Sequence, residues 1–426
     1  MNSRKKLVII GGGFAGLRIA RDIDKRQWEV MIIDKNNYHS FPPLFYQVAS
    51  AGLEPASISF PLRRELRGRR YSGCTFHIGT VRRIDTAAKR VHTDYETVAY
   101  DSLVIAAGTT NNFFGIPDLQ KHVCTIKSTT EAIRTRNEVI NNLERASLST
   151  DPAERCRLLT FVVVGGGPAG VEIAGALGEL KRFALRREYP LIRPDEMRVV
   201  LVEGSNALLG AMGPRSSADA LKGLRQLMVD VRLGVTMKNF DGNRITFADG
   251  TEIEVCTVIW TAGVTGVTFT LGGTDIRPGR GARFAVDEYC AVEGLKDVYA
   301  VGDIALMTTE KYPHGHPQVA QVAMQMGAAL ARNLSNPERR SPFVYHDKGS
   351  MATIGRNRAV VDMGKMHLSG WFAWFTWLTV HLMSLLGMRN RAMVLLNWIW
   401  NYWTFSGGYK LLFRPDRYPV RTYWER

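Results

Sequence analysis

Two glycine-rich stretches have the residue types and spacing that suit binding of a dinucleotide. One reads GGGFAG over Gly11–Gly16, and the other reads GGGPAG over Gly165–Gly170. In a G-x-G-x-x-G turn, the first glycine allows a tight turn, the second lets a pyrophosphate approach the backbone, and the third permits close helix–strand packing. An acidic residue should then accept hydrogen bonds from the adenosine ribose, and Asp34 and Glu203 are the candidates.

Each glycine turn is flanked by the elements that must position it. Apolar runs precede the turns, and two further apolar runs, Val30–Ile33 and Val199–Val202, lead directly to Asp34 and Glu203. The N-terminus of the intervening helix would offer free N–H groups and a positive dipole end to phosphates. A single glycine motif is weak evidence, but the order strand, turn, helix, strand and acid occurs twice. The chain is therefore predicted to bind two dinucleotides, a resident flavin and a diffusing nicotinamide.

The acid of the second unit also predicts a coenzyme preference. A carboxylate at Glu203 would repel the 2′-phosphate of NADPH, and no arginine follows it directly in EGSNALLG. Arg215 is the nearest downstream cation. NADH is therefore favoured over NADPH.

A pair of glutamines marks a second kind of candidate chemistry. Gln321 and Gln325 are four residues apart in a segment expected to be helical from Pro317, so both amides lie on one helix face. One interpretation is a packed helix with two satisfied amides, and the other places both amides over the flavin ring. The segment SLVIAAGTT is a predicted buried strand that ends in Ala-Ala-Gly, and many flavoproteins return to the cofactor in this way; the alternative is an ordinary buried strand with a glycine turn. CTVIWTAGV repeats this pattern, and DVYAVGD follows later in the chain.

Composition limits the remaining possibilities. The chain has 426 residues, which suffices for two or three domains, and its net charge of +15 suits an anionic membrane surface or nucleic acid. No nucleic-acid motif is present, so no nucleic-acid partner is expected. The five cysteines form no C-x-x-C pair, which argues against a dithiol reductase, and no metal site is expected because His314 and His316 have no acid or cysteine cluster beside them. The N-terminus, MNSRKK, does not look like a signal peptide.

From Ser369 the composition changes to that of a membrane-associated segment. The run Trp371–Gly387 contains no acidic or basic side chain other than a histidine, and a second apolar run, Ala392–Phe405, carries a polar stripe. Tryptophan, concentrated here, favours the lipid–water interface. We expect two helices lying in one leaflet, with Lys410, Arg414 and Arg417 available for lipid phosphates. A dimer interface and a single membrane span are the alternatives.

At this point the chain resembles the type II NADH dehydrogenases, single-subunit flavoenzymes that pass electrons from NADH to quinone without pumping protons. The nucleotide-binding turns are shared with the wider two-dinucleotide flavoprotein superfamily, whereas AQVAMQ and the tryptophan-rich C-terminal helices around RNR are more specific. The motifs that carry the resemblance are GGGFAG, PPLFYQVA (Pro42–Ala49), AAGTT, VVVGGGPAGVEIAGALGEL (Val162–Leu180), WTAGV, YAVGD, AQVAMQ (Ala320–Gln325) and RNR (Arg389–Arg391).

The resemblance implies the roles of individual residues. Glu172 should lie near the nicotinamide, Gln321 and Gln325 between flavin and quinone, and Asp303 on the ribityl chain of a non-covalent FAD. The predicted FAD contacts are Gly11, Gly13, Phe14, Ala15, Gly16, Asp34, Lys35, Ala107, Gly108 and Asp303. The predicted contacts of NADH, the substrate, are Gly165, Gly167, Pro168, Ala169, Gly170, Glu203, Ala262 and Gly263.

The expected fold is α/β, with two Rossmann-like dinucleotide-binding domains and C-terminal membrane-associated amphipathic helices. Residues 1–120 and 265–340 would form the FAD domain, 121–264 the NADH domain and 341–426 the membrane anchor. The expected partners are NADH, a membrane quinone and the phospholipid surface, on the cytoplasmic face of the inner membrane, and a homodimer is left open.

Three rival functions remain at this stage. A sulfide:quinone oxidoreductase needs cysteines flanking the flavin, and a soluble ferredoxin or thiol reductase does not need the C-terminal helices. A non-catalytic or nucleic-acid-binding flavoprotein that resembles the apoptosis-inducing factor group is consistent with the net charge of +15, but no nucleic-acid motif supports it.

Overall fold

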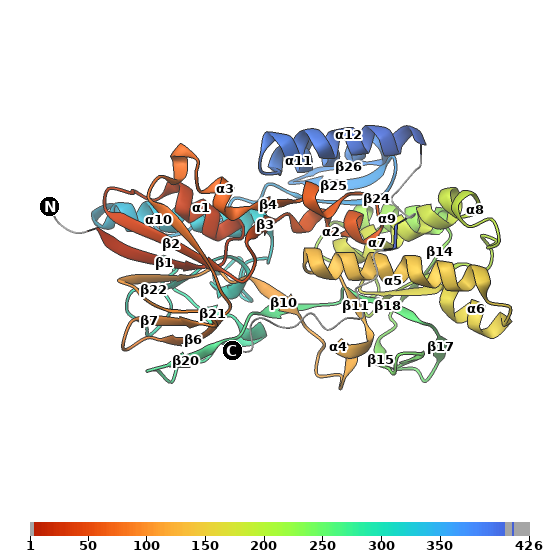
Figure 1. The fold of residues 1–426 in the computed structure, drawn as a ribbon, viewed down its shortest axis with the longest axis horizontal. Coiled ribbons are helices and arrows are strands. Elements are labelled where there is room, and N and C mark those ends of the chain that lie inside the picture. Colours follow the sequence, from red (N-terminus) through yellow and green to blue (C-terminus); the bar gives the residue numbers. More distant parts are fainter. Residues whose placement is uncertain (1–3, 405–410, 413–426) are drawn as a thin grey trace. The chain divides into compact units, whose positions relative to one another are not determined.

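A computed structural model describes residues 4–404 and 411–412, and its contacts divide the chain into two units (Figure 1). The first comprises the N-terminal segment up to Phe41 together with Ser59–Asn112 and Gly263–Gly349. The second comprises Pro42–Ile58, Phe113–Ala262 and the segment that begins at Ser350. Each unit is built around its own parallel sheet.

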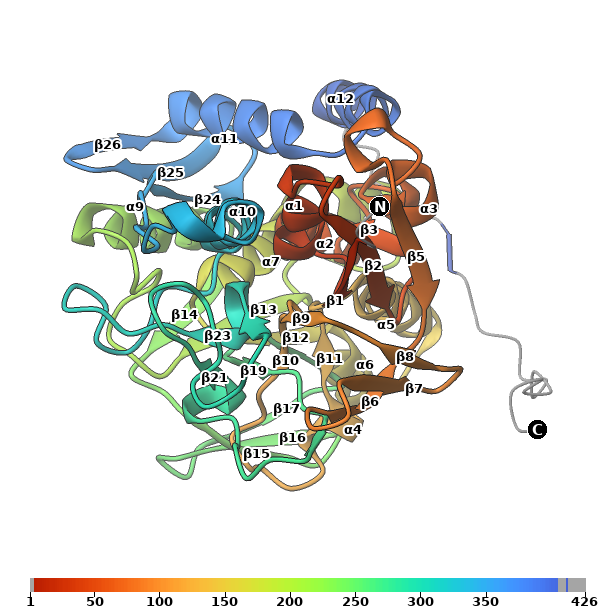
Figure 2. The ribbon, with the colours of Figure 1, turned by 90° about the vertical axis from the view of Figure 1, so that its left-hand side faces the viewer.

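The sheet of the first unit has five strands in the order β22-β9-β1-β2-β5, and every neighbouring pair is parallel. Its central strands are almost wholly buried, as expected for parallel strands covered on both faces. Helices α1 (Phe14–Asp22) and α10 (Ala320–Ser335) lie side by side in Figures 1 and 2. The strands are β22 (Val298–Ala300), β9 (Ser102–Ile105), β1 (Lys5–Ile10), β2 (Trp28–Asp34) and β5 (Cys74–Ile78).

The second unit repeats this plan with the parallel sheet β11-β18-β12-β13-β14. All five residues of β12 are buried, and helices α5 (Thr129–Leu148) and α7 (Pro168–Glu179) belong to the same unit. The strands are β11 (Cys124–Thr125), β18 (Thr257–Trp260), β12 (Thr160–Val164), β13 (Arg198–Glu203) and β14 (Val229–Leu233).

The C-terminal part of the second unit is an antiparallel sheet followed by two helices. Strands β24 (Ser350–Gly355), β25 (Arg358–Met363) and β26 (Met366–Ser369) form the sheet, and α11 (Gly370–Ser384) lies against it in both views. Helix α12 (Met388–Thr404) follows, and among the described residues no helix is both long and apolar enough to cross a membrane.

Helix α7 and strand β24 pack through a glycine. A Cβ added at Gly175 would overlap the carbonyl oxygen of Ile354, so only a residue without a side chain allows this close approach. The C-terminal sheet therefore packs directly on the helix that follows the second glycine turn.

The α/β fold with two Rossmann-like units is confirmed. One helix start is corrected: α10 begins at Ala320 rather than Pro317, because Val319 is still in an extended conformation and serves as the N-cap. The proposed domain boundaries stay a prediction, although the structure groups the C-terminal helices with the second unit. Lys410, Arg414 and Arg417 lie outside the described residues.

Candidate functional site

The first glycine turn is shaped to leave room for a phosphate. Gly11 has a φ of +109°, and a Cβ there would overlap the carbonyl oxygen of Ala106. A Cβ added at Gly13, the N-cap of α1, would meet nothing within 4 Å. The backbone at the start of the helix is therefore open at the position where a pyrophosphate would bind.

Asp34 holds this turn from the end of β2. Its carboxylate accepts hydrogen bonds from Gly12 N at 2.7 Å and from Asn36 N at 2.7 Å. Burial raises the pKa of Asp34, whereas these two N–H donors lower it. Lys35 follows directly. Because a carboxylate has about four lone-pair sites, Asp34 can bind the turn and a ribose hydroxyl at once.

The second glycine turn has the same design. Gly165 has a φ of +113° and packs against Ala262, and a Cβ at Gly167 would again meet nothing within 4 Å. Glu203 accepts from Gly166 N at 2.6 Å and from Ser205 N at 2.7 Å. We call each glycine turn, together with its acid, a cradle. The two cradles share one geometry, and the residues of each fit a dinucleotide.

Asp303 follows β22, which runs parallel to β9 and β1, so it lies at the same edge of the sheet as the first glycine turn. The hydroxyl of Thr109, just after Ala107 and Gly108, donates to its carboxylate at 3.3 Å, and Gln318 donates to its backbone carbonyl at 2.9 Å. A Cβ added at Gly302 would lie 3.6 Å from the Cβ of Ala15 in α1. The structure therefore brings the predicted FAD residues together within the first unit.

The side-chain amides of Gln321 and Gln325 form hydrogen bonds with the backbone of residues 346–349, which connect α10 to β24. Gln321 donates to Gly349 O at 3.0 Å and accepts from Lys348 N at 3.0 Å. Gln325 donates to His346 O at 2.9 Å and accepts from His346 N at 3.0 Å. Both side chains lie on one face of α10, as predicted, and they hold the segment that leads into β24.

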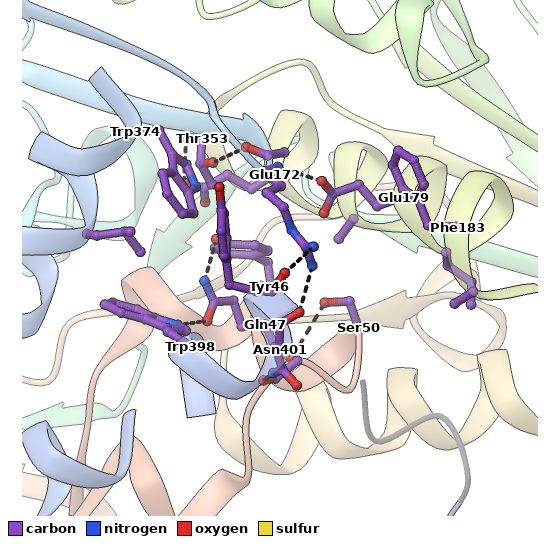
Figure 3. Close-up of a pocket in the computed structure, with 18 residues that line it drawn as sticks. Tyr46, Gln47, Ser50, Glu172, Glu179, Phe183, Thr353, Trp374, Trp398 and Asn401 are labelled. Carbon is purple, nitrogen blue, oxygen red and sulfur yellow. Dashed lines mark hydrogen bonds between the residues drawn. The ribbon is translucent and has the colours of Figure 1, made fainter. Parts of the chain in front are cut away.

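Glu172 lies in a pocket of the second unit, shown in Figure 3. Its side chain projects from α7 and accepts a hydrogen bond from Thr353 N at 3.4 Å, and the residue is only 8% exposed. Burial raises its pKa well above the ordinary value of a glutamate, which favours the protonated form of the carboxyl. Burial and the neighbouring Glu172 also raise the pKa of Tyr46 well above its ordinary value.

The walls of this pocket come from five separate segments of the second unit. Gln47 accepts a hydrogen bond from the indole of Trp398 at 2.8 Å, and Asn401 donates to Gly52 O at 2.9 Å, so α12 is fastened to the segment around α2 (Phe45–Ala49). The cavity has a volume of about 170 Å³. Its labelled lining residues are Tyr46, Gln47, Ser50, Glu172, Glu179, Phe183, Thr353, Trp374, Trp398 and Asn401.

The sequence singled out only one of these residues, Glu172, as catalytic. The others were missed because they come from segments far apart in the chain. Two local signals were nevertheless visible: the aromatic PPLFYQVA segment, and a second glutamate seven residues after Glu172, which places both on one face of α7.

Helices α11 and α12 are apolar on their exposed side. Ala373 and Trp377 of α11 are buried, whereas Phe372 and Trp403 are more than 70% exposed. Such a large exposed apolar face marks a site of contact with a membrane or another protein. The exposed members are Trp371, Phe372, Phe375, Val380, Met383, Met388, Met393, Leu395, Leu396, Ile399, Trp400 and Trp403.

The cysteines do not form a redox pair. All five are free in the structure, and burial raises the pKa of Cys290 and, to about 12, that of Cys124. Within residues 4–404 and 411–412, no group of three or more His, Cys, Asp or Glu side chains could hold a metal ion.

Comparison with known proteins covers nearly the whole chain. A family model described as pyridine nucleotide-disulphide oxidoreductase matches residues 5–327, and one described as NDH2 C-terminal domain matches residues 347–404. The type II NADH:quinone oxidoreductases NdhA and Ndh of Mycobacterium tuberculosis are 37% and 35% identical to it, each match covering 93% of this chain and 87% of the relative.

Two solved structures share the fold. NDH2 from Plasmodium falciparum, in complex with NADH, superposes with a TM-score of 0.87 at 21% identity, covering 94% of this chain and 99% of that one. The sulfide:quinone oxidoreductase of Aquifex aeolicus has a TM-score of 0.72 at 19% identity, covering 94% and 96%. At sequence identities this low, the two comparisons show only that the fold is shared.

Proposed function

The chain belongs to the type II NADH:quinone oxidoreductase family, and on that premise we propose that it transfers a hydride from NADH to a bound FAD and reduces a membrane quinone without pumping protons. The observation that carries this proposal is the presence of two open dinucleotide cradles together with a pocket, built partly by the C-terminal helices, that holds a buried carboxyl with a raised pKa.

FAD would bind in the first unit. The open backbone at Gly13 would receive its pyrophosphate, Asp34 its adenosine ribose, and Asp303 its ribityl chain. When bound, the flavin supplies the chemistry that accepts a hydride and passes two electrons on. The protein's own residues would hold it at the end of β1.

The first prediction is that the full-length protein copurifies with non-covalent FAD. Gly13→Leu should lower the flavin content by at least tenfold, because its side chain would occupy the open space where the pyrophosphate binds. Flavin released by denaturation and quantified by absorbance gives the measurement. Gly210→Ala, at another position where a Cβ meets nothing within 4 Å, is the matched control. Correctly folded wild-type protein without flavin would contradict the proposal.

NADH would bind in the second unit, with its pyrophosphate at Gly167 and its adenosine ribose at Glu203. The second prediction concerns the coenzyme preference. Glu203→Gln keeps a side-chain oxygen for Gly166 N but removes the charge that repels a 2′-phosphate. We expect the ratio of kcat/KM for NADH to that for NADPH to fall roughly tenfold, about 1.4 kcal/mol. An unchanged ratio would show that Glu203 does not face the ribose.

The quinone headgroup would enter the pocket of Figure 3, between the aromatic side chains of Tyr46, Trp374 and Trp398. Gln47 could hydrogen-bond a quinone oxygen, and Glu172, whose protonated form burial favours, could donate a proton to it. We assign Gln321 and Gln325 to the same half-reaction, through the segment 346–349 that they hold.

The exposed apolar face of α11 and α12 would dock on the phospholipid surface, peripherally and on the cytoplasmic face of the inner membrane. The third prediction is that a chain truncated before Ser369 leaves the membrane fraction while retaining FAD, and that high salt alone does not release the intact protein. Sedimentation with anionic vesicles measures both. Because Trp374, Trp398 and Asn401 are lost, quinone reduction should also fall. A truncated chain that still sedimented would refute this docking surface, and a chain that failed to fold would point to a dimer interface.

The overall proposal is tested with full-length protein purified in detergent and supplied with NADH and a soluble quinone. Sulfide and NADPH replace NADH as controls. We expect rapid NADH-dependent quinol formation, much slower turnover with NADPH and none with sulfide. Sulfide-dependent quinone reduction would instead favour the rival sulfide:quinone chemistry, and salt-sensitive DNA binding without quinone reduction would favour a non-catalytic flavoprotein.

A further inference from the structure

Helix α7 presents two carboxyl groups to the same cavity. Glu172 and Glu179 are seven residues apart, so they lie on one face of the helix, and both line the pocket of Figure 3. The helix rise places them about 10 Å apart along the axis. Ala176 lies between them and also lines the pocket. Its side chain is a single methyl group, so the cavity of about 170 Å³ that all three residues line has room for water beside it.

The two carboxyls have different surroundings. Glu172 is buried, whereas Glu179 is partly exposed and accepts a hydrogen bond from Arg356 N at 2.5 Å. The guanidinium of Arg356 donates to Asn401 O and Tyr402 O, each at 2.9 Å, which fastens the end of α12 beside Glu179. Glu179 is therefore the carboxyl that protons from solution reach first.

The groups around this part of the pocket affect the pKa values of both Glu172 and Glu179. Burial raises the pKa of Glu179 as it does that of Glu172, and Arg356 and Arg358 partly oppose this effect at Glu179. Tyr46 of α2 faces Glu172, and the pocket residues of α11 and α12 carry no acidic or basic side chain. Glu172 and Glu179 are the two carboxyl groups of the lining, and burial favours the protonated form of each.

We propose that Glu179 returns a proton from solution to Glu172 after each quinone is reduced, which deepens, and rests on, the function proposed above. NADH supplies a hydride, and through the flavin the quinone gains two electrons and one proton. The second proton comes from the O–H of Glu172, which leaves a carboxylate. That carboxylate takes a proton from Glu179 through water beside Ala176, and Glu179 takes one from solution. The sum is NADH + H⁺ + quinone → NAD⁺ + quinol.

The test compares single and multiple turnover of the full-length protein. In Glu179→Gln, the first reoxidation of reduced flavin by a soluble quinone should proceed within about twofold of the wild-type rate, because in this scheme Glu172 carries its own proton for the first turnover. Later turnovers should slow at least tenfold. Small weak acids such as formic acid should restore the steady-state rate, and Glu179→Asp should retain part of it. A purely structural role would not produce this separation or the rescue.

Glu138→Gln is the matched control, because Glu138 is also a partly buried glutamate of the second unit but lies outside the pocket. Ala176→Leu is a second variant, which should slow later turnovers with both carboxyls intact. Equal rates for wild type and Glu179→Gln in multiple turnover would overturn the relay. If Glu172→Gln also left reoxidation unchanged, the quinone pocket itself would be wrong, so the two failures can be told apart.

Discussion

Replacing Glu172 by glutamine should slow reoxidation of the reduced flavin by quinone by two orders of magnitude or more. General acid catalysis is worth about 10²- to 10⁴-fold in rate, and Glu172 is a buried carboxyl of the pocket, beside its aromatic walls, whose pKa burial raises. The amide of glutamine has the same size and can still accept the N–H of Thr353. The fold should therefore be retained.

Stopped-flow spectroscopy of the flavin separates the two half-reactions. Flavin reduction by NADH should change less than threefold in Glu172→Gln. Because the protonated carboxyl is the active form, the wild-type reoxidation rate should fall as the pH rises through the pKa of Glu172, and the variant should lose this dependence. The resemblance placed Glu172 near the nicotinamide. Slowed reduction with unchanged reoxidation would support that earlier role and refute the one proposed from the pocket.

The cradles could be predicted because their parts are close in sequence and each has a local physical cause. A buried strand, a turn that needs glycine and an acid at the end of the next strand are all visible in the order of residues. The structure adds that Asp34 and Glu203 also accept the N–H of the middle glycine of each turn, at 2.7 and 2.6 Å. The same acid thus stabilises the turn and, in our proposal, binds the ribose.

The pocket could not be predicted in the same way. Its lining residues come from distant parts of the chain. More than 100 residues separate Tyr46 from Glu172 and Glu172 from Thr353, and Trp398 belongs to yet another helix, so only folding brings them together. The glutamines of α10 illustrate an intermediate case. Their four-residue spacing correctly predicted a shared face, but their partners are backbone groups of 346–349, which have no sequence signature.

The largest structural effect is expected at Gly175, where α7 meets the backbone of β24. Gly175→Val would force its Cβ into the carbonyl oxygen of Ile354, and a carbonyl in a sheet cannot turn aside as a side chain can. Overpacking of this kind costs about 3 kcal/mol, more than the roughly 0.4 kcal/mol of helix propensity that valine gains over glycine. The C-terminal sheet should separate from α7 and disturb Thr353, the backbone partner of Glu172.

We therefore expect Gly175→Val to lower the midpoint of thermal unfolding and to reduce quinone reduction at least tenfold, while FAD, held by the first unit, stays bound. Differential scanning calorimetry and flavin content measure the two effects, and Gly175→Ala should show the same changes to a smaller degree. Gly210→Ala, where the added Cβ meets nothing within 4 Å, should behave like wild type. Wild-type stability and quinone reduction in Gly175→Val would show that the C-terminal sheet does not depend on this contact, and that the pocket is held by α11 and α12 instead.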